Sequence, residues 1–253
     1  MENGLAQVLI GAVVGGVIGS FLNVVIHRVP RGESIVSPGS RCPSCKAGIA
    51  PYDNVPVLSW LVLRGRCRHC GTGIPVRYPL VEALTALAFS LIVAIQGPDL
   101  ELLVLLPFAA MLIAVAGIDL DHRIVPNRIL LPAAVFAVAA SLLVRPDDLP
   151  ALLIAGAAAF TFLLVAALAY PAGMGMGDVK LAGVMGLFLG LSVVPGLLVG
   201  FAAGAFVGIA LIVREGASAR KKGVPFAPFL AFGGLVALVA GPELIDVYAS
   251  NFL

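Results

Sequence analysis

The feature that most constrains this chain is a series of eight apolar runs that occupy most of its 253 residues. A helix needs roughly 20 apolar residues to cross a hydrocarbon core of about 30 Å. The chain is 60% hydrophobic and 12% charged, whereas soluble domains are about half apolar and a quarter charged. We therefore predict an all-α polytopic membrane protein with about eight transmembrane helices. They are expected near 5 to 27, 80 to 96, 100 to 118, 129 to 144, 150 to 171, 179 to 190, 192 to 213 and 227 to 248, the sixth being short.

The lysine and arginine residues predict the orientation of these helices, because loops on the cytoplasmic side carry an excess of basic residues. Of the 16 basic residues, 15 follow the first, third, fifth and seventh runs. The exception is Arg145. This pattern predicts an even number of spans with both termini periplasmic. It also places Asp178 at the cytoplasmic edge of the membrane. The net charge of +2 is too small to indicate a nucleic-acid partner.

All four cysteines lie in the long loop between the first two runs, residues 29 to 79. They form two C-x-x-C pairs, Cys42 with Cys45 and Cys67 with Cys70, which are separated by 21 residues. This spacing is typical of a tetrahedral zinc site with four thiolates, and disulfides are unfavourable in the cytoplasm. We therefore predict a small zinc-ribbon-like cytoplasmic domain with structural Zn²⁺, because so short a segment has little core of its own.

Two alternatives to a structural zinc stay open. The pairs could be redox motifs, although the strand and helix context of a thioredoxin-like motif is not evident in this loop. The zinc could also be catalytic if one coordination position were open. His69 lies inside the second pair and is expected to be a bystander, since four thiolates already complete the shell.

Carboxylates are rare on the predicted cytoplasmic side, and two groups of them adjoin apolar runs. Asp119 and Asp121 follow the third run, and residues two apart on a helix point about 200° apart, so only one can face a given partner. Asp119 is the deeper of the two. Asp178 follows "GMGMG", whose glycines, Gly173, Gly175 and Gly177, are expected to leave an irregular backbone that can bind an extended chain.

Each of these carboxylates also has a purely structural interpretation. Asp119 could mark a helix end that meets water, and Asp178 could be the N-cap of the sixth helix. Taken together, however, two acids at one depth on different spans predict a dyad. Such a pair shares one proton, so that one member activates water while the other remains protonated. Lys180 is expected to be a topology anchor.

These residues resemble those of the bacterial prepilin peptidases, or type IV leader peptidases, which are GxGD aspartyl proteases. "GMGD" at Gly175 to Asp178 is similar to the second catalytic motif of that family, and Asp119 with "IVPN" to the first. Similar segments follow in the same order along nearly the whole chain: "GSFLNVVIHRVP" from Gly19, the cysteine pairs, "RYPLVEALTA" from Arg77 and "VPFAPFLA" from Val224. Ala227 departs from the P-F-G-P of the family.

The resemblance implies a bifunctional enzyme of the bacterial inner membrane. Asp119 and Asp178 would cleave the leader from type IV prepilins and type II secretion pseudopilins at the cytoplasmic face. The new amino terminus, usually phenylalanine, would then be methylated with S-adenosylmethionine. Gly175, Gly177 and Glu82 are candidate substrate contacts, although Glu82 could instead be a helix-start acid that the helix dipole favours.

The expected organisation is a first transmembrane helix over 1–28, a methyltransferase-associated zinc loop over 29–79 and a seven-helix peptidase domain over 80–253. A proton- or ion-coupled transporter with intramembrane acids is the main alternative function. A membrane anchor whose zinc loop recruits partners is the other. The transporter requires Asp119 and Asp178 near the bilayer centre, whereas the peptidase requires them together at one edge.

Overall fold

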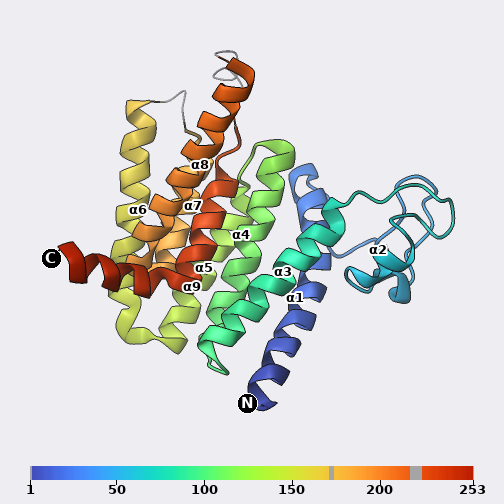
Figure 1. Ribbon diagram of the computed structural model, residues 1–253, viewed down its shortest axis with the longest axis horizontal. Helices are drawn as coiled ribbons and strands as arrows, with labels where there is room; N and C mark the ends of the chain where they lie inside the picture. Colours follow the sequence, from blue (N-terminus) through green and yellow to red (C-terminus); the bar gives the residue numbers. More distant parts are fainter. Residues whose placement is uncertain (1, 171–173, 217–223, 253) are drawn as a thin grey trace. The chain divides into compact units, whose positions relative to one another are not determined.

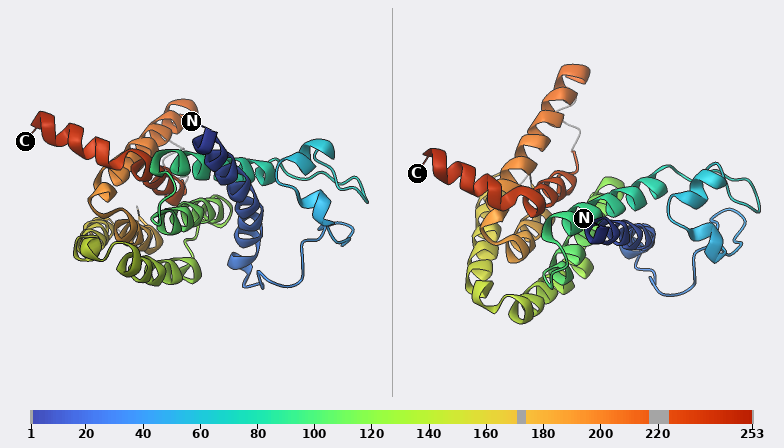
Figure 2. Two further views of the ribbon diagram at one scale, coloured as in Figure 1. Left: turned by 90° about the horizontal axis from the view of Figure 1, so that it is seen from below. Right: turned by 60° about the horizontal axis from the view of Figure 1, so that its bottom comes forward.

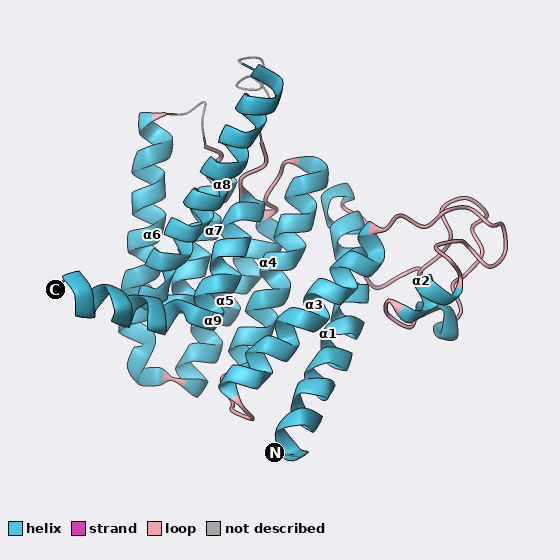
Figure 3. Ribbon diagram, viewed as in Figure 1, coloured by secondary structure: helices cyan, strands magenta, loops and turns pink. Residues whose placement is uncertain are grey.

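The computed structural model describes residues 2–170, 174–216 and 224–252, and these segments are mostly helical apart from the cysteine loop (Figures 1 and 3). Within them, the only β-type pairings are two isolated bridges in the cysteine loop. The chain divides into two compact units, residues 1–102 and 103–253. The prediction of an all-α architecture is therefore confirmed.

The first unit contains the long helices α1 (Glu2–Arg28) and α3 (Arg77–Gln96), with the short helix α2 (Leu58–Val62) in the loop between them. The helices α1 and α3 pack closely because glycines face the contact. A Cβ atom on Gly15 would lie 2.6 Å from the carbonyl oxygen of Thr85, and one on Gly19 would lie 2.7 Å from Cα of Glu82. Small residues that let backbones approach in this way are typical of helix pairs in membranes.

The second unit contains six helices, among which α7 (Met176–Leu189) packs mainly against α6 (Leu149–Ala169) and lies alongside it (Figure 2). Four side chains of α7, those of Val179, Leu181, Ala182 and Met185, have no exposed surface. The helices of this unit are α4 (Leu102–His122), α5 (Asn127–Val144), α6 (Leu149–Ala169), α7 (Met176–Leu189), α8 (Val193–Glu215) and α9 (Ala227–Phe252).

Polar contacts hold α7 near both of its ends. Near its start, Lys180 Nζ donates a hydrogen bond to Oδ1 of Asn127, the first residue of α5, over 3.1 Å. Near its end, Arg145 donates to the carbonyl oxygen of Phe188 over 2.6 Å. Arg145 is the one basic residue outside the predicted cytoplasmic loops, and this contact gives it a structural partner.

Seven segments of the described chain are long and apolar enough to cross a membrane. One of them, Met176–Glu215, comprises both α7 and α8, which a 3-10 turn over Gly190–Ser192 connects. Gly190 has φ of 57°, a value that favours glycine, so the chain changes direction there. The 14 residues of α7 measure about 21 Å, less than the thickness of a hydrocarbon core. The sixth span is short, as predicted, because α7 ends at the turn that begins with Gly190.

Candidate active site and metal centre

Asp119 and Asp178 are both buried in the second unit, with 5% and 8% of their surface exposed. Asp119 lies in the last turn of α4 and Asp178 in the first turn of α7. The two carboxylates are close enough for their charges to interact. By contrast, Asp121 is exposed, so the sequence argument that one of the two neighbouring acids faces inward identified the correct residue.

The backbone amide of Ala227 orients Asp119. This amide, at the first residue of α9, donates a hydrogen bond to Oδ2 of Asp119 over 3.1 Å. At a helix start, backbone N–H groups have no partner within the helix and are free to bind an anion. The "VPFAPFLA" segment thus contributes a backbone amide to the site, which the sequence did not reveal. Alanine in place of glycine at position 227 retains this amide.

The glycine segment before Asp178 is more regular than the sequence suggested. Gly175 is extended and is the N-cap of α7, and its carbonyl oxygen accepts a hydrogen bond from the Asp178 amide over 3.1 Å. The interpretation of Asp178 as an N-cap is therefore wrong. The expectation that the whole segment is irregular is also wrong, because Met176 and Gly177 are helical. Gly173 lies outside the described residues.

Gly177 is needed for close packing against the loop that follows Asp119. An added Cβ atom would lie 2.7 Å from Cβ of Val125, which is tighter than real contacts between such atoms. Two contacts thus fix the start of α7 against the "IVPN" segment: Gly177 packs on Val125, and Lys180 donates a hydrogen bond to Asn127. Lys180, expected to be only a topology anchor, connects the two sequence motifs.

The two aspartates share one end of the second unit. The helix α4 ends there, and α5, α7 and α9 begin there, at the top of Figure 1. Asp119 and Asp178 therefore lie near helix ends and not at the middle of the helices. This position agrees with a site at a membrane edge and disagrees with the transporter alternative.

The four cysteine thiols in the first unit form one cluster, in which all sulfur atoms lie within 4.8 Å of one another. Cys42 Sγ and Cys70 Sγ are 3.7 Å apart. Four sulfurs at about 2.3 Å from a tetrahedral zinc would be about 3.8 Å apart, so the donor set fits one zinc ion. Hydrogen bonding with the side chain and backbone of Thr72 lowers the pKa of Cys70 to about 6, which favours the thiolate that a metal binds.

The two halves of this centre repeat one local structure. We call them the first knuckle (Cys42–Cys45) and the second knuckle (Cys67–Cys70). Each half reads R-C-x-x-C-x-x-G-I, beginning at Arg41 and Arg66. The amides of Cys42 and Cys67 donate to the carbonyl oxygens of Ala47 and Thr72, over 2.9 and 2.8 Å. His69 is not part of the cluster of metal-binding groups found among the described residues. This repeat is visible in the sequence and extends beyond the cysteines, from which alone the metal site was predicted.

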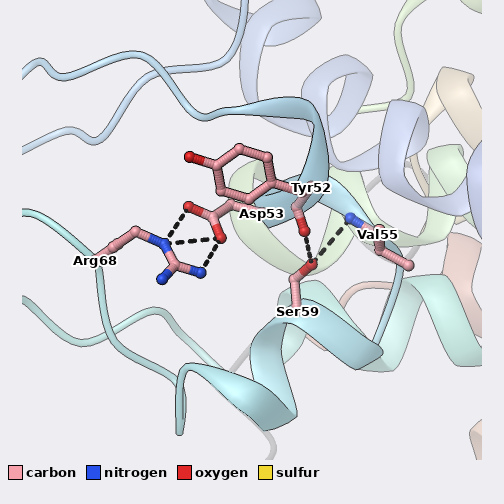
Figure 4. A network of polar contacts seen from close by, with 5 residues as sticks. All are labelled: Tyr52, Asp53, Val55, Ser59 and Arg68. Carbon is pink, nitrogen blue, oxygen red and sulfur yellow. Dashed lines mark hydrogen bonds and ion pairs between the residues drawn. The ribbon is translucent and has the colours of Figure 1, made fainter.

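An ion pair joins the second knuckle to the turn before α2. Asp53 accepts hydrogen bonds from Arg68, the shortest of 2.6 Å, and these hold the pKa of the Asp53 carboxyl below its usual range (Figure 4). From the first turn of α2, the Ser59 hydroxyl accepts a hydrogen bond from the Val55 amide and donates to the Tyr52 carbonyl oxygen. These contacts fix the shape of the loop beside the metal centre.

Glu82 lies on α3 in the first unit. Its Oε2 atom accepts a hydrogen bond from the backbone amide of Val57 over 2.7 Å, which connects α3 to the start of α2. The first turn of α3 contains no acid, and Glu82 follows it, so the interpretation as a helix-start acid is wrong. Glu82 instead supports the loop that carries the cysteines.

Comparisons with known proteins match two family models and several relatives. Residues 13–96 match the model of the bacterial peptidase A24 N-terminal domain, and residues 106–213 match that of the type IV leader peptidase family. The chain is 35% identical to the prepilin leader peptidase/N-methyltransferase of Bacillus subtilis, over 93% of this chain and 95% of the relative. It is 36% identical to the protein of that name from Aeromonas hydrophila, over 93% and 91%. It is 41% identical to the one from Myxococcus xanthus, over 81% and 63%. No solved structure matches.

Proposed function

Because the chain belongs to the type IV leader peptidase family, we propose that it removes the leader peptide from type IV prepilins and from type II secretion pseudopilins. A second step methylates the amino terminus that cleavage exposes. The observation that carries the first step is the pair of buried carboxylates, Asp119 and Asp178, at one end of the second unit.

In the proposed cleavage step, the two aspartates share one proton. The ionised member takes a proton from water as the water oxygen attacks the scissile carbonyl carbon, and the protonated member donates its proton to the carbonyl oxygen. Collapse of the tetrahedral intermediate returns that proton to the pair. The leaving nitrogen takes the other, and the C–N bond breaks. The leader then ends in a carboxyl group and the pilin in a free amine.

The neighbouring residues position this pair. The Ala227 amide fixes Asp119, while Val125 and Asn127 fix the start of α7 and so the carboxylate of Asp178. Gly175 is exposed and extended, and a Cβ atom added there would lie 3.6 Å from Oδ2 of Asp178. We assign Gly175 as the backbone beside which an extended substrate lies, since extended segments bind by pairing with exposed backbone groups. Gly177 serves this site through its packing.

The site is proposed to face the cytoplasm from the bacterial inner membrane, with both termini in the periplasm. The basic residues support this orientation, because they follow alternate spans in the chain. A prepilin with an apolar helix in the bilayer would present its leader junction at the membrane edge, where both aspartates are proposed to lie.

The second step uses S-adenosylmethionine, which supplies a methyl group from a positively charged sulfur. The lone pair of the neutral amine forms the new N–C bond as the S–C bond breaks, and the amine releases a proton to water. An α-amino group has a pKa near 8, so a useful fraction is neutral at physiological pH. The cysteine loop is proposed to serve this step, with zinc as its scaffold and Cys42, Cys45, Cys67 and Cys70 as ligands.

The cleavage assignment is tested with Asp119→Asn and Asp178→Asn in purified enzyme, using a prepilin substrate and mass measurement of the product. Each change keeps the shape of the side chain but removes its ionisable group, so cleavage is expected to fall by at least about a thousandfold. The matched control is Asp121→Asn, which alters an exposed acid two residues from Asp119. Normal cleavage by both site variants would disprove the dyad.

A further inference from the structure

A cavity of about 180 Å³ lies within the first unit, between the cysteine knuckles, α2 and the start of α3. Its walls combine aromatic rings with groups of both charges. They include Trp60, Tyr78, Asp53, Glu82, Arg41 and Arg68. None of these residues takes part in the proposed cleavage chemistry. Glu82 alone was expected from the sequence to contact a substrate.

The indole of Trp60 is a rigid part of this cavity. Its Nε1–H donates to the carbonyl oxygen of Ile74 over 3.0 Å. Gly65 lies directly against the ring, where an added Cβ atom would be 2.8 Å from Cζ2. Gly65 also has φ of 65°, so a side chain at this position would be strained as well as crowded. A fixed aromatic surface of this kind suits stacking with a planar ring.

Both carboxylates of the cavity are held in place. Asp53, with 9% of its side chain exposed, is bound by the guanidinium of Arg68. Glu82 is bound through Oε2 to the Val57 amide, whose residue has φ of 61°. Each contact uses only part of the capacity of a carboxylate, which can accept several hydrogen bonds. The remaining capacity is available to hydroxyl groups and cations.

We propose that this cavity is the binding site for the adenosyl methyl donor, a proposal that rests on the methylation step of the proposed function. S-adenosylmethionine combines a planar adenine, ribose hydroxyls, a cationic sulfonium and an amino-acid end with one ammonium and one carboxylate. Trp60 and Tyr78 provide aromatic surfaces for the adenine and the sulfonium. Glu82 and Asp53 suit the hydroxyls and the cations, and Arg41 suits the carboxylate.

The position of the cavity also indicates what the metal centre does. Cys42 and Cys67 belong to its wall, one from each knuckle. The ion therefore holds together the two halves of the chain between which the donor binds. Zinc acts here by fixing the shape of the cavity.

The test uses Trp60 as its own reporter, because it is the only tryptophan in the chain. The full-length, metal-loaded enzyme in detergent is titrated with S-adenosylhomocysteine while tryptophan emission is recorded, and a saturable change is expected. Equilibrium dialysis with labelled S-adenosylmethionine gives an independent dissociation constant. Glu82→Gln is expected to weaken binding by at least about tenfold, since it removes a charged acceptor.

The matched control is Glu33→Gln, the same chemical change at an exposed residue of the first unit that is not part of the cavity wall. It should leave the dissociation constant unchanged. Trp60→Phe, which keeps an aromatic ring, should abolish the emission signal while dialysis still detects binding. Zinc content and thermal unfolding are measured for every variant, so that a loss of fold is recognised.

Two results would overturn this assignment in different ways. If dialysis detects the donor but Trp60 emission does not change and Glu82→Gln binds normally, the donor binds elsewhere, and the proposed methylation stands. If the wild-type enzyme neither binds the donor nor adds a methyl group to cleaved prepilin, the methylation step itself is wrong.

Discussion

Replacement of Gly177 by alanine tests whether the contact between the two sequence motifs sets the geometry of the aspartates. The new Cβ atom would lie 2.7 Å from Cβ of Val125 and 3.1 Å from its Cγ2. Carbon atoms prefer separations of about 3.5 to 4.0 Å, so the start of α7 must move by about 1 Å. Rotation of the Val125 side chain cannot relieve the closer contact, because the position of Cβ is fixed by the backbone.

A shift of this size should affect catalysis more than folding. Overpacking of a core costs about 1 to 3 kcal/mol, which a helix that packs against four others can tolerate. A misplacement of about 1 Å at a catalytic group reduces the rate by about a hundredfold. We therefore expect Gly177→Ala to lower kcat for leader cleavage by about a hundredfold, with a smaller change in KM.

The assay is the initial rate of prepilin cleavage in detergent over a range of substrate concentrations. Gly208→Ala is the matched control, because it makes the same change on α8, where an added Cβ atom would meet nothing within 4 Å. Val125→Gly removes both crowded atoms, so the double variant with Gly177→Ala should recover at least tenfold of the lost rate. Wild-type kcat in Gly177→Ala, or no recovery in the double variant, would refute the packing argument.

Three further outcomes follow from the described contacts. Ala227→Pro removes the amide that binds Asp119 at a position where a helix tolerates proline, and cleavage should fall by about 10- to 100-fold, whereas Ala227→Gly retains the amide and should retain activity in the same rate assay. Lys180→Met keeps the apolar stem but removes the hydrogen bond to Asn127. We therefore expect the free energy of unfolding, measured by thermal denaturation, to fall by about 1 kcal/mol and kcat to fall several-fold. Metal removal by a chelator, or Cys42→Ser, should alter Trp60 emission and abolish donor binding in dialysis, while Asp119 and Asp178 still cleave prepilin; unchanged emission and donor binding would contradict the scaffold role of the ion.

The sequence predicted those features that depend on composition and spacing. The apolar runs predicted the helices, and the spacing of Cys42, Cys45, Cys67 and Cys70 predicted a single cluster. The choice of Asp119 over Asp121 followed from the period of a helix and from the greater depth of Asp119 in the apolar run. Each of these inferences needs only local geometry, which the order of residues determines.

Features that depend on tertiary approach were not predicted. Gly177 was expected in an irregular segment because glycine weakens helices, but packing on Val125 stabilises a helical turn there. The partner of Asp119 is a backbone amide 108 residues away, and no side chain at Ala227 signals it. The cavity beside Trp60 likewise forms only when the two knuckles fold together. Such contacts join segments whose separation in the chain gives no periodic signal.

The hydrogen bond from Ala227 to Asp119 has a consequence for biosynthesis. A chain that emerges from the ribosome in order makes α4 and α7, with both aspartates, well before it makes the first residue of α9. The nascent enzyme therefore carries its two acids through membrane insertion without the group that orients one of them. Because loss of that hydrogen bond is expected to lower cleavage by about 10- to 100-fold, the enzyme is expected to reach its full activity only after α9 has docked.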